Sequence, residues 1–146
     1  RAHAARAVLE GVAYELRMSV EVMENAMGEP FETIRLSGGG ANSVFWSQVQ
    51  ADIYGRPVER LIVSECAALG AAILGGVGAG ALPSVDVAVD NMVHTRGFIY
   101  PNEDNHAVDN EYYEVFKKAF LAWANADVYN DLADVNARMA DNPAAN

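Results

Sequence analysis

Three consecutive glycines are the strongest candidate for chemistry in this sequence. Gly38, Gly39 and Gly40 follow a short alternating run at residues 34–36 and precede a segment with helical spacing. Glycine lets a backbone approach a ligand closely, and the free N–H groups of a helix's first turn attract anions. A glycine turn between a strand and a helix is therefore typical of phosphate or nucleotide binding. The alternative is a tight turn that binds nothing.

Two common nucleotide-binding patterns are absent from this stretch. No lysine follows the glycines as in a Walker A loop, and the G-x-G-x-x-G spacing is missing. Gln48 and Asp52, one helical turn apart, could reach a nucleotide or a metal, but we interpret them as a capped or solvated polar face of the helix. The histidines show no metal-ligand spacing, and we expect them at the surface: His3, His94 and His106.

The first element that positions the glycines is an amphipathic helix. Apolar residues recur at three- and four-residue steps over residues 6–27, which predicts one buried helical face. Arg17 can pair with Glu21 across one turn of this helix. Gly28 is the expected stop, and Pro30 prevents the helix from continuing.

The elements on either side of the glycines are predicted from alternation and from capping residues. A strand is expected over residues 32–37, and a helix is expected over residues 43–54. Either Asn42 or Ser43 can cap this helix, because both side chains accept from a free N–H of the first turn. Gly55 is expected to end it.

A second strand and a small apolar helix follow. The strand is predicted over residues 58–63, and the helix over residues 65–80 is apolar on every face, which predicts a buried helix. Ser64 or Glu65 fits its N-terminal end. Cys66 is predicted to be a small buried residue.

The last third of the chain is predicted to be mostly helical. Residues 84–93 are expected to form a short helix, residues 96–100 an extended segment and residues 102–106 a polar loop. A long helix with a break near Asn125 follows, and residues 141–146 are expected to be frayed. An aromatic stripe marks the long helix: Tyr112, Phe116, Ala119, Phe120 and Trp123.

These elements together indicate an α/β fold with its strands in one sheet. Two clear strands are too few for a stable sheet, so we expect a preceding part of the domain. The aromatic stripe could cover the core or serve a homodimer.

Composition excludes several classes of protein. The chain has 146 residues, half of them hydrophobic, and a formal net charge of -10, so we expect a folded domain that binds neither nucleic acid nor membrane. Its longest apolar run is too short to cross a bilayer. The single cysteine excludes an intramolecular disulfide, and no signal peptide is recognisable, so we expect a cytoplasmic protein.

Three stretches in order resemble the FGGY family of carbohydrate kinases. The helix at residues 5–15 resembles the family's second signature. The glycine turn, with Trp46, Gln48, Asp52 and Gly55, looks like its adenosine motif. Glu65 and the run at residues 68–72 look like its glycine- and alanine-rich helix. The resemblance covers about residues 5–80.

The resemblance implies a fold, an activity and a set of binding residues. The fold is part of a ribonuclease H-like domain of the actin-like ATPase type. The activity is phosphoryl transfer from Mg-ATP to a sugar hydroxyl, with xylulose or a related ketose or polyol as acceptor, so the expected cofactors are ATP and Mg²⁺. The residues expected at the nucleotide are Gly38, Gly39, Gly40, Ala41, Asn42, Ser43, Glu65 and Leu69.

The resemblance also implies what this chain does not supply. The family's catalytic aspartate and its sugar-binding residues are expected upstream of Arg1, so this chain alone should not catalyse. We assign residues 1–101 to the C-terminal part of the second kinase domain and residues 102–146 to a helical extension. The alternative function is a nucleotide-binding regulatory or assembly module without kinase activity.

Overall fold

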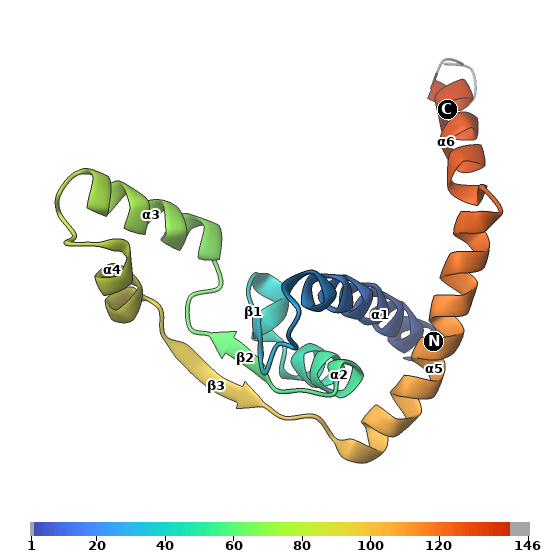
Figure 1. Cartoon of the computed structure of the whole chain (residues 1–146), viewed down its shortest axis with the longest axis horizontal. Coiled ribbons are helices and arrows are strands. Elements are labelled where there is room, and N and C mark those ends of the chain that lie inside the picture. Colours follow the sequence, from blue (N-terminus) through green and yellow to red (C-terminus); the bar gives the residue numbers. More distant parts are fainter. Residues whose placement is uncertain (1, 141–146) are drawn as a thin grey trace. The chain divides into compact units, whose positions relative to one another are not determined.

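The computed structural model describes residues 2–140 and divides the chain into two compact units, residues 1–109 and 110–146. The expected fraying of residues 141–146 lies outside the described residues. Figure 1 labels the α-helices and strands, and with one short 3-10 helix they make up the elements of the described residues. These are α1 (Ala2–Met27), β1 (Ile34–Leu36), the short 3-10 helix η1 (Gly39–Asn42), α2 (Val44–Tyr54), β2 (Val58–Leu61), α3 (Cys66–Gly78), α4 (Val85–Met92), β3 (Thr95–Ile99), α5 (Glu103–Asn125) and α6 (Val128–Ala140).

The sheet has three strands rather than the two that the alternation predicts. β1 pairs in parallel with β2, with Ile34 opposite Val58, and β3 pairs with the other edge of β2 in the antiparallel sense. Val58 therefore also faces Ile99 across the ladder. The third strand is the predicted extended segment at residues 96–100, whose Gly97 and irregular alternation give a weak strand signal.

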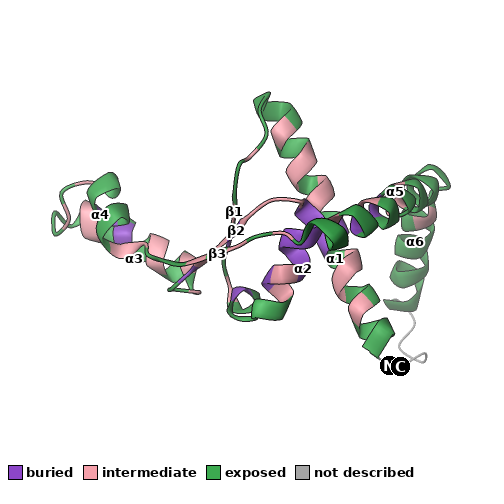
Figure 2. Ribbon diagram, turned by 90° about the horizontal axis from the view of Figure 1, so that it is seen from below, coloured by how far each residue is buried: buried purple, intermediate pink, exposed green. Residues whose placement is uncertain are grey.

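The core of the first unit lies on α2. Val49, Ala51 and Ile53 are almost fully buried. α1 contacts this helix and has two buried residues of its own, Ala13 and Tyr14. Figure 2 shows the buried residues gathered on α2 and on the adjoining part of α1. A helix buried on most sides is the fixed element on which the preceding glycine turn rests.

The predicted ends of the two N-terminal helices are confirmed. Gly28 has a φ of 79° and Gly55 a φ of 65°, the left-handed conformation that ends helices at little cost for glycine. Arg17 Nε lies 3.2 Å from Glu21 Oε1, as predicted. In the last turns of α1, Glu24 accepts a hydrogen bond from the N–H of Phe31, which follows the helix, at 2.7 Å. This hydrogen bond, followed by the neighbouring Arg56, lowers the pKa of Glu24.

The predicted polar loop at residues 102–106 is wrong. α5 already begins at Glu103, because Asn102 Oδ1 accepts from the N–H of Asn105 at 3.0 Å and so caps the helix.

The prediction that His106 lies at the surface is also wrong. Its Nδ1 lies 2.7 Å from the Asp52 carbonyl oxygen, and a Cβ built on Gly55 would overlap its ring.

A buried carboxyl group lies further along α5. The Tyr14 hydroxyl donates to Asp109 Oδ1 at 3.3 Å, while Asp109 Oδ2 is buried without a hydrogen-bond partner. Burial, with the negative charge of Glu10 second, raises the pKa of Asp109. Burial also raises the pKa of Tyr14. Ionisation of Asp109 therefore lowers the stability of the fold.

The expectation that α3 is buried is wrong for this chain. Ile73 is its one buried residue, and Cys66 is half-buried rather than buried. The reason is that α3 contacts mainly α4, a short helix that Ser84 caps by accepting from the N–H of Val87 at 3.2 Å. A helix with one short neighbour cannot bury a surface that is apolar all round.

In the second unit, the predicted helix break near Asn125 is confirmed. α5 ends at Asn125, Asp127 has a φ of 61°, and α6 begins at Val128. The Phe120 ring lies 6.3 Å from the Phe116 ring and 6.1 Å from that of Tyr129, measured between centroids. The two ends of the aromatic stripe, Tyr112 and Trp123, are exposed, and none of the described residues of α6 is buried.

Candidate functional site

The glycine turn begins with a residue that the fold itself requires to be glycine. Gly38 has φ 81° and ψ 176°, a region of backbone conformation that is essentially restricted to glycine. Its N–H donates to the carbonyl oxygen of Ser64 at 2.9 Å, and its own carbonyl accepts from the N–H of Ala41 at 3.1 Å. Gly38 thus ties the end of β1 to the segment that starts α3.

The second glycine is not required by the fold. A Cβ built on Gly39 meets no atom within 4 Å, and its φ lies outside the left-handed region. A Cβ on Gly40 would lie 3.2 Å from Trp46 Cδ1. Among the described residues, the N–H groups of Gly39 and Gly40 have no hydrogen-bond partner, as expected for the first turn of a helix. Gly39 therefore combines space for a ligand beside its backbone with an N–H group that can donate to that ligand.

The last residues of the turn have separate roles. Ser43 is the cap of α2, since its Oγ accepts from the N–H of Trp46 at 3.2 Å. This settles the capping alternative in favour of Ser43 over Asn42. Ala41 is buried beneath the turn, whereas Asn42 is exposed. Asn42 is therefore the polar side chain of the turn that the helix cap does not use.

Two arginines that local sequence reasoning missed hold the end of the turn. Arg60 on β2 donates from Nε to the Ala41 carbonyl oxygen at 2.8 Å and from Nη2 to the Asn42 carbonyl oxygen at 3.1 Å. Arg96 on β3 donates from Nη1 to Asn42 Oδ1 at 3.0 Å. Within residues 2–140, neither arginine forms a salt bridge with a carboxylate. Their positive charges stay beside the turn in a chain that is acidic overall.

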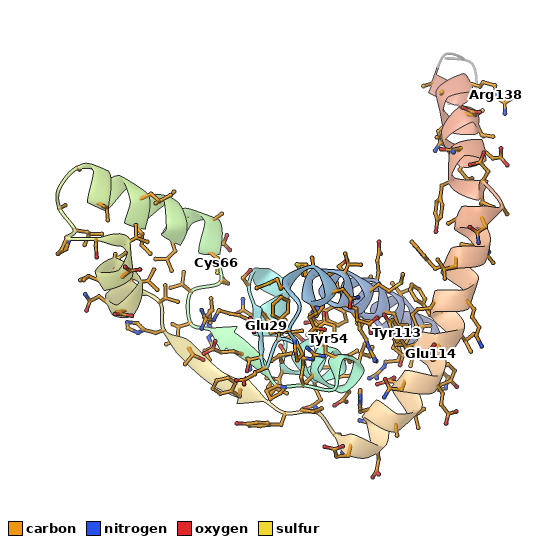
Figure 3. The ribbon with its side chains drawn as sticks, viewed as in Figure 1. Glu29, Tyr54, Cys66, Tyr113, Glu114 and Arg138 are labelled. Atoms are coloured by element: carbon orange, nitrogen blue, oxygen red, sulfur yellow. The ribbon has the colours of Figure 1, made fainter. Side chains whose placement is uncertain are left out.

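The other two predicted site residues lie at and beyond the start of α3. Glu65 directly follows Ser64, which accepts the Gly38 N–H, so it stands next to the turn. It occupies the N-cap position of α3, but its side chain makes no capping hydrogen bond and is exposed. Leu69 lies one turn further along. Figure 3 labels Cys66, the residue that follows Glu65.

Gln48 and Asp52 have a structural role, but Asp52 is buried and does not lie on the solvated polar face that we expected. Asp52 is 2% exposed, and its carboxylate accepts from the N–H of Asn102 at 2.8 Å and from Asn105 Nδ2 at 2.9 Å. Gln48 Nε2 donates to Asp52 Oδ1 at 2.7 Å and to the Tyr100 carbonyl oxygen at 2.9 Å. These bonds fix the start of α5 to α2.

The geometry fits one of the two expected cofactors better than the other. The open backbone at Gly39, with its free N–H groups, suits the phosphates of a nucleotide. For a metal, no group of three or more His, Cys, Asp or Glu side chains comes together within residues 2–140.

Over the same residues, no helix is both long and apolar enough to cross a membrane.

Comparisons with known proteins agree on one family. Residues 1–79 match the profile of the FGGY family of carbohydrate kinases, C-terminal domain. Xylulose kinase from Staphylococcus epidermidis is 37% identical over 120 residues, which cover 82% of this chain and 24% of that protein. Glycerol kinase from Haemophilus influenzae is 39% identical over 130 residues, which cover 87% of this chain and 25% of that protein.

A solved structure gives the same result. The crystal structure of xylulose kinase from Rhodospirillum rubrum matches with a TM-score of 0.69 and 30% identity, over 84% of this chain and 25% of that one. The chain belongs to the FGGY family of carbohydrate kinases, and it corresponds to the C-terminal portion of these enzymes. It spans about a quarter of the length of the relatives it matches.

Proposed function

We propose that this chain supplies the adenosine side of the ATP site in a carbohydrate kinase. The observation that carries the proposal is Gly39, whose backbone is open to a ligand although the fold does not need a glycine there. Membership of a kinase family supports the same conclusion. The proposed frame is a ribonuclease H-like domain of the actin-like ATPase fold.

In this proposal the glycine turn holds the nucleotide through its backbone. Gly38, Gly39 and Gly40 run past the phosphates, and Ala41 passes the ribose. Asn42 contacts the adenosine part, with Ser43 beside it as the cap that holds α2 in place. Phosphoryl transfer depends mainly on positioning and charge stabilisation, so a rigid cradle with nearby positive charge is a suitable part.

Glu65 and Leu69 are proposed to wall the adenine. The contact between Gly38 and Ser64 supports this role, since it brings the start of α3 to the turn. Bound Mg²⁺ would neutralise charge on the phosphates. Because no donor cluster for a metal is found among residues 2–140, we assign no residue of this chain to it.

The acceptor is proposed to be a hydroxyl of a ketose or a polyol, with xylulose as the first candidate. The names of the relatives, xylulose kinase and glycerol kinase, support this class. An aspartate general base would have to come from outside this chain, since the family's base is expected upstream of Arg1.

The test is an ADP-release assay on the gene product that carries this chain, with Mg-ATP and a panel of pentuloses, polyols and aldonates. We expect release with one acceptor class, and a separate calorimetric titration should show ADP binding. ADP binding without turnover of any acceptor would favour the regulatory or assembly module. Failure to bind ADP at all would refute the nucleotide site.

A further inference from the structure

The strand β3 contains one residue more than its ladder with β2 needs. Arg60 faces Gly97 and Leu61 faces Thr95, so Arg96 lies between two paired positions as a β-bulge. The bulge has its own hydrogen bonds: Thr95 Oγ1 donates to the Arg60 carbonyl oxygen at 3.1 Å and accepts from the Gly97 N–H at 2.9 Å. Bulges of this kind redirect a side chain and often lie beside functional sites.

The redirected side chain of Arg96 reaches the glycine turn. Its Nη1 donates to Asn42 Oδ1 at 3.0 Å and its Nη2 to the Ile62 carbonyl oxygen at 3.1 Å. Two anchors on one planar guanidinium leave it little freedom. Arg60 holds the main chain of the same residue, through the Asn42 carbonyl oxygen. Two neighbouring strands thus fix both the backbone and the side chain of Asn42.

The chemistry of the guanidinium decides which way the Asn42 amide faces. Arginine has five N–H donors and no acceptor, so only the oxygen of the Asn42 amide can turn toward Arg96. The amide NH₂ group therefore points away from Arg96. Since Asn42 is exposed, both of its N–H bonds are available to a ligand.

We propose that Arg96 is a positioning residue, which holds Asn42 so that its amide presents hydrogen-bond donors to the nucleoside part of the bound nucleotide. The inference rests on the proposed function and extends it. Asn42 would then recognise an acceptor atom, such as a ribose hydroxyl oxygen or a ring nitrogen of the base. Arg96 itself would not need to contact the ligand.

The test is a double-mutant cycle on ADP binding, measured by calorimetry on the gene product that carries this chain. Asn42→Ala should weaken ADP binding about 3- to 10-fold, the range of one net hydrogen bond. Arg96→Met should weaken it by up to the same factor. Because Arg96 acts through Asn42, the double variant should bind no more weakly than Asn42→Ala alone. Arg96→Lys should restore only part of the loss, since an ammonium cannot hold both anchors.

Arg35→Met is the matched control. Arg35 lies on β1 of the same sheet and pairs with Glu59 at 2.6 Å rather than with a residue of the turn, so its removal should leave ADP affinity unchanged. If Arg96→Met weakens binding equally in the wild-type and Asn42→Ala backgrounds, Arg96 does not act through Asn42 and the proposal is overturned. Wild-type protein that fails to bind ADP would instead refute the proposed function on which this inference rests.

A second variant separates the donor from the geometry. Asn42→Asp keeps an oxygen toward Arg96 but removes both N–H donors. Adenosine, which carries no charge, is the probe, so repulsion between carboxylate and phosphate does not enter. We expect Asn42→Asp to lose adenosine affinity as Asn42→Ala does. Wild-type affinity in this variant would overturn the proposal, because the donors would then be dispensable.

Discussion

Replacing the glycines of the turn one at a time should separate what the fold requires from what the ligand requires. Gly38→Ala places a Cβ in a backbone conformation at φ 81° and ψ 176° that is essentially restricted to glycine. Such strain costs of order 1–3 kcal/mol. The variants are made in the gene product that carries this chain, and for proteins of 150–250 residues each kcal/mol corresponds to about 2–4 °C in Tm. Gly38→Ala should therefore lower the Tm by about 2–12 °C.

Gly39→Ala should behave in the opposite way. The added Cβ meets nothing within 4 Å and the backbone is not left-handed, so the Tm should stay within about 2 °C of wild type. The same Cβ would occupy the space proposed for the phosphates. The loss of one hydrogen bond to a charged group is worth about 1.5–3 kcal/mol, which corresponds to a roughly 10- to 160-fold weaker binding of ADP.

The assay pairs thermal unfolding with an ADP titration for both variants of the gene product that carries this chain. Gly40→Ala serves as an intermediate case, because its Cβ would press on Trp46 Cδ1 at 3.2 Å and disturb both readouts. The reasoning is refuted if Gly39→Ala binds ADP as tightly as wild type. It is also refuted if the Tm of Gly39→Ala is as low as that of Gly38→Ala, since the Cβ added at position 39 would then disturb the fold.

Three further predictions concern stability, measured by denaturant unfolding. The pKa of Asp109 is raised in the fold, so wild type loses stability as the pH rises from the ordinary pKa of 3.8 to the raised pKa of the folded state. Asp109→Asn should therefore be about 1 kcal/mol more stable than wild type at pH 7 and no more stable in acid. Glu24 has the opposite sign, because the Phe31 N–H lowers its pKa. Glu24→Gln should cost at most about 1 kcal/mol at pH 7, since solvent screens this carboxylate. The difference should begin to shrink below pH 4.5, the ordinary pKa, and vanish once the pH is below the lowered pKa of the folded state. Gly55→Ala should cost at least about 1–2 kcal/mol because of the left-handed φ of this residue. The overlap of the new Cβ with the His106 ring should add to this cost, and His106→Ala in the same protein should recover part of that added cost. A pH-independent difference in either carboxyl variant, or a Gly55→Ala variant as stable as wild type, would contradict these assignments.

The elements that sequence alone predicted are those whose signals are local. The helix at residues 6–27 and its stop at Gly28 depend on periodicity and on one residue's conformation, and both are confirmed. The loop predicted at residues 102–106 is wrong although a local signal existed: Asn102 followed by Glu103 and Asp104 is a typical helix start.

The features that sequence did not predict arise from contacts between distant residues. Arg60 and Arg96 lie 18 and 54 positions from Asn42, and nothing near either arginine indicates its partner. The exposure of α3 was missed for a related reason, since composition reports how apolar a helix is but not whether a neighbour covers it. The roles of Glu65 and Leu69 toward adenine stay predictions.

The bulge at Arg96 makes the length of the chain between α4 and α5 part of the proposed site. Deleting this one residue would leave β3 opposite β2 in an uninterrupted ladder, so the sheet would become more regular while Asn42 lost its anchor. Relatives that are one residue shorter here should therefore lack the arginine and orient the end of the glycine turn in another way. Insertions and deletions in this segment, rather than substitutions, would then show which relatives have gained or lost the contact between the bulge arginine and the glycine turn.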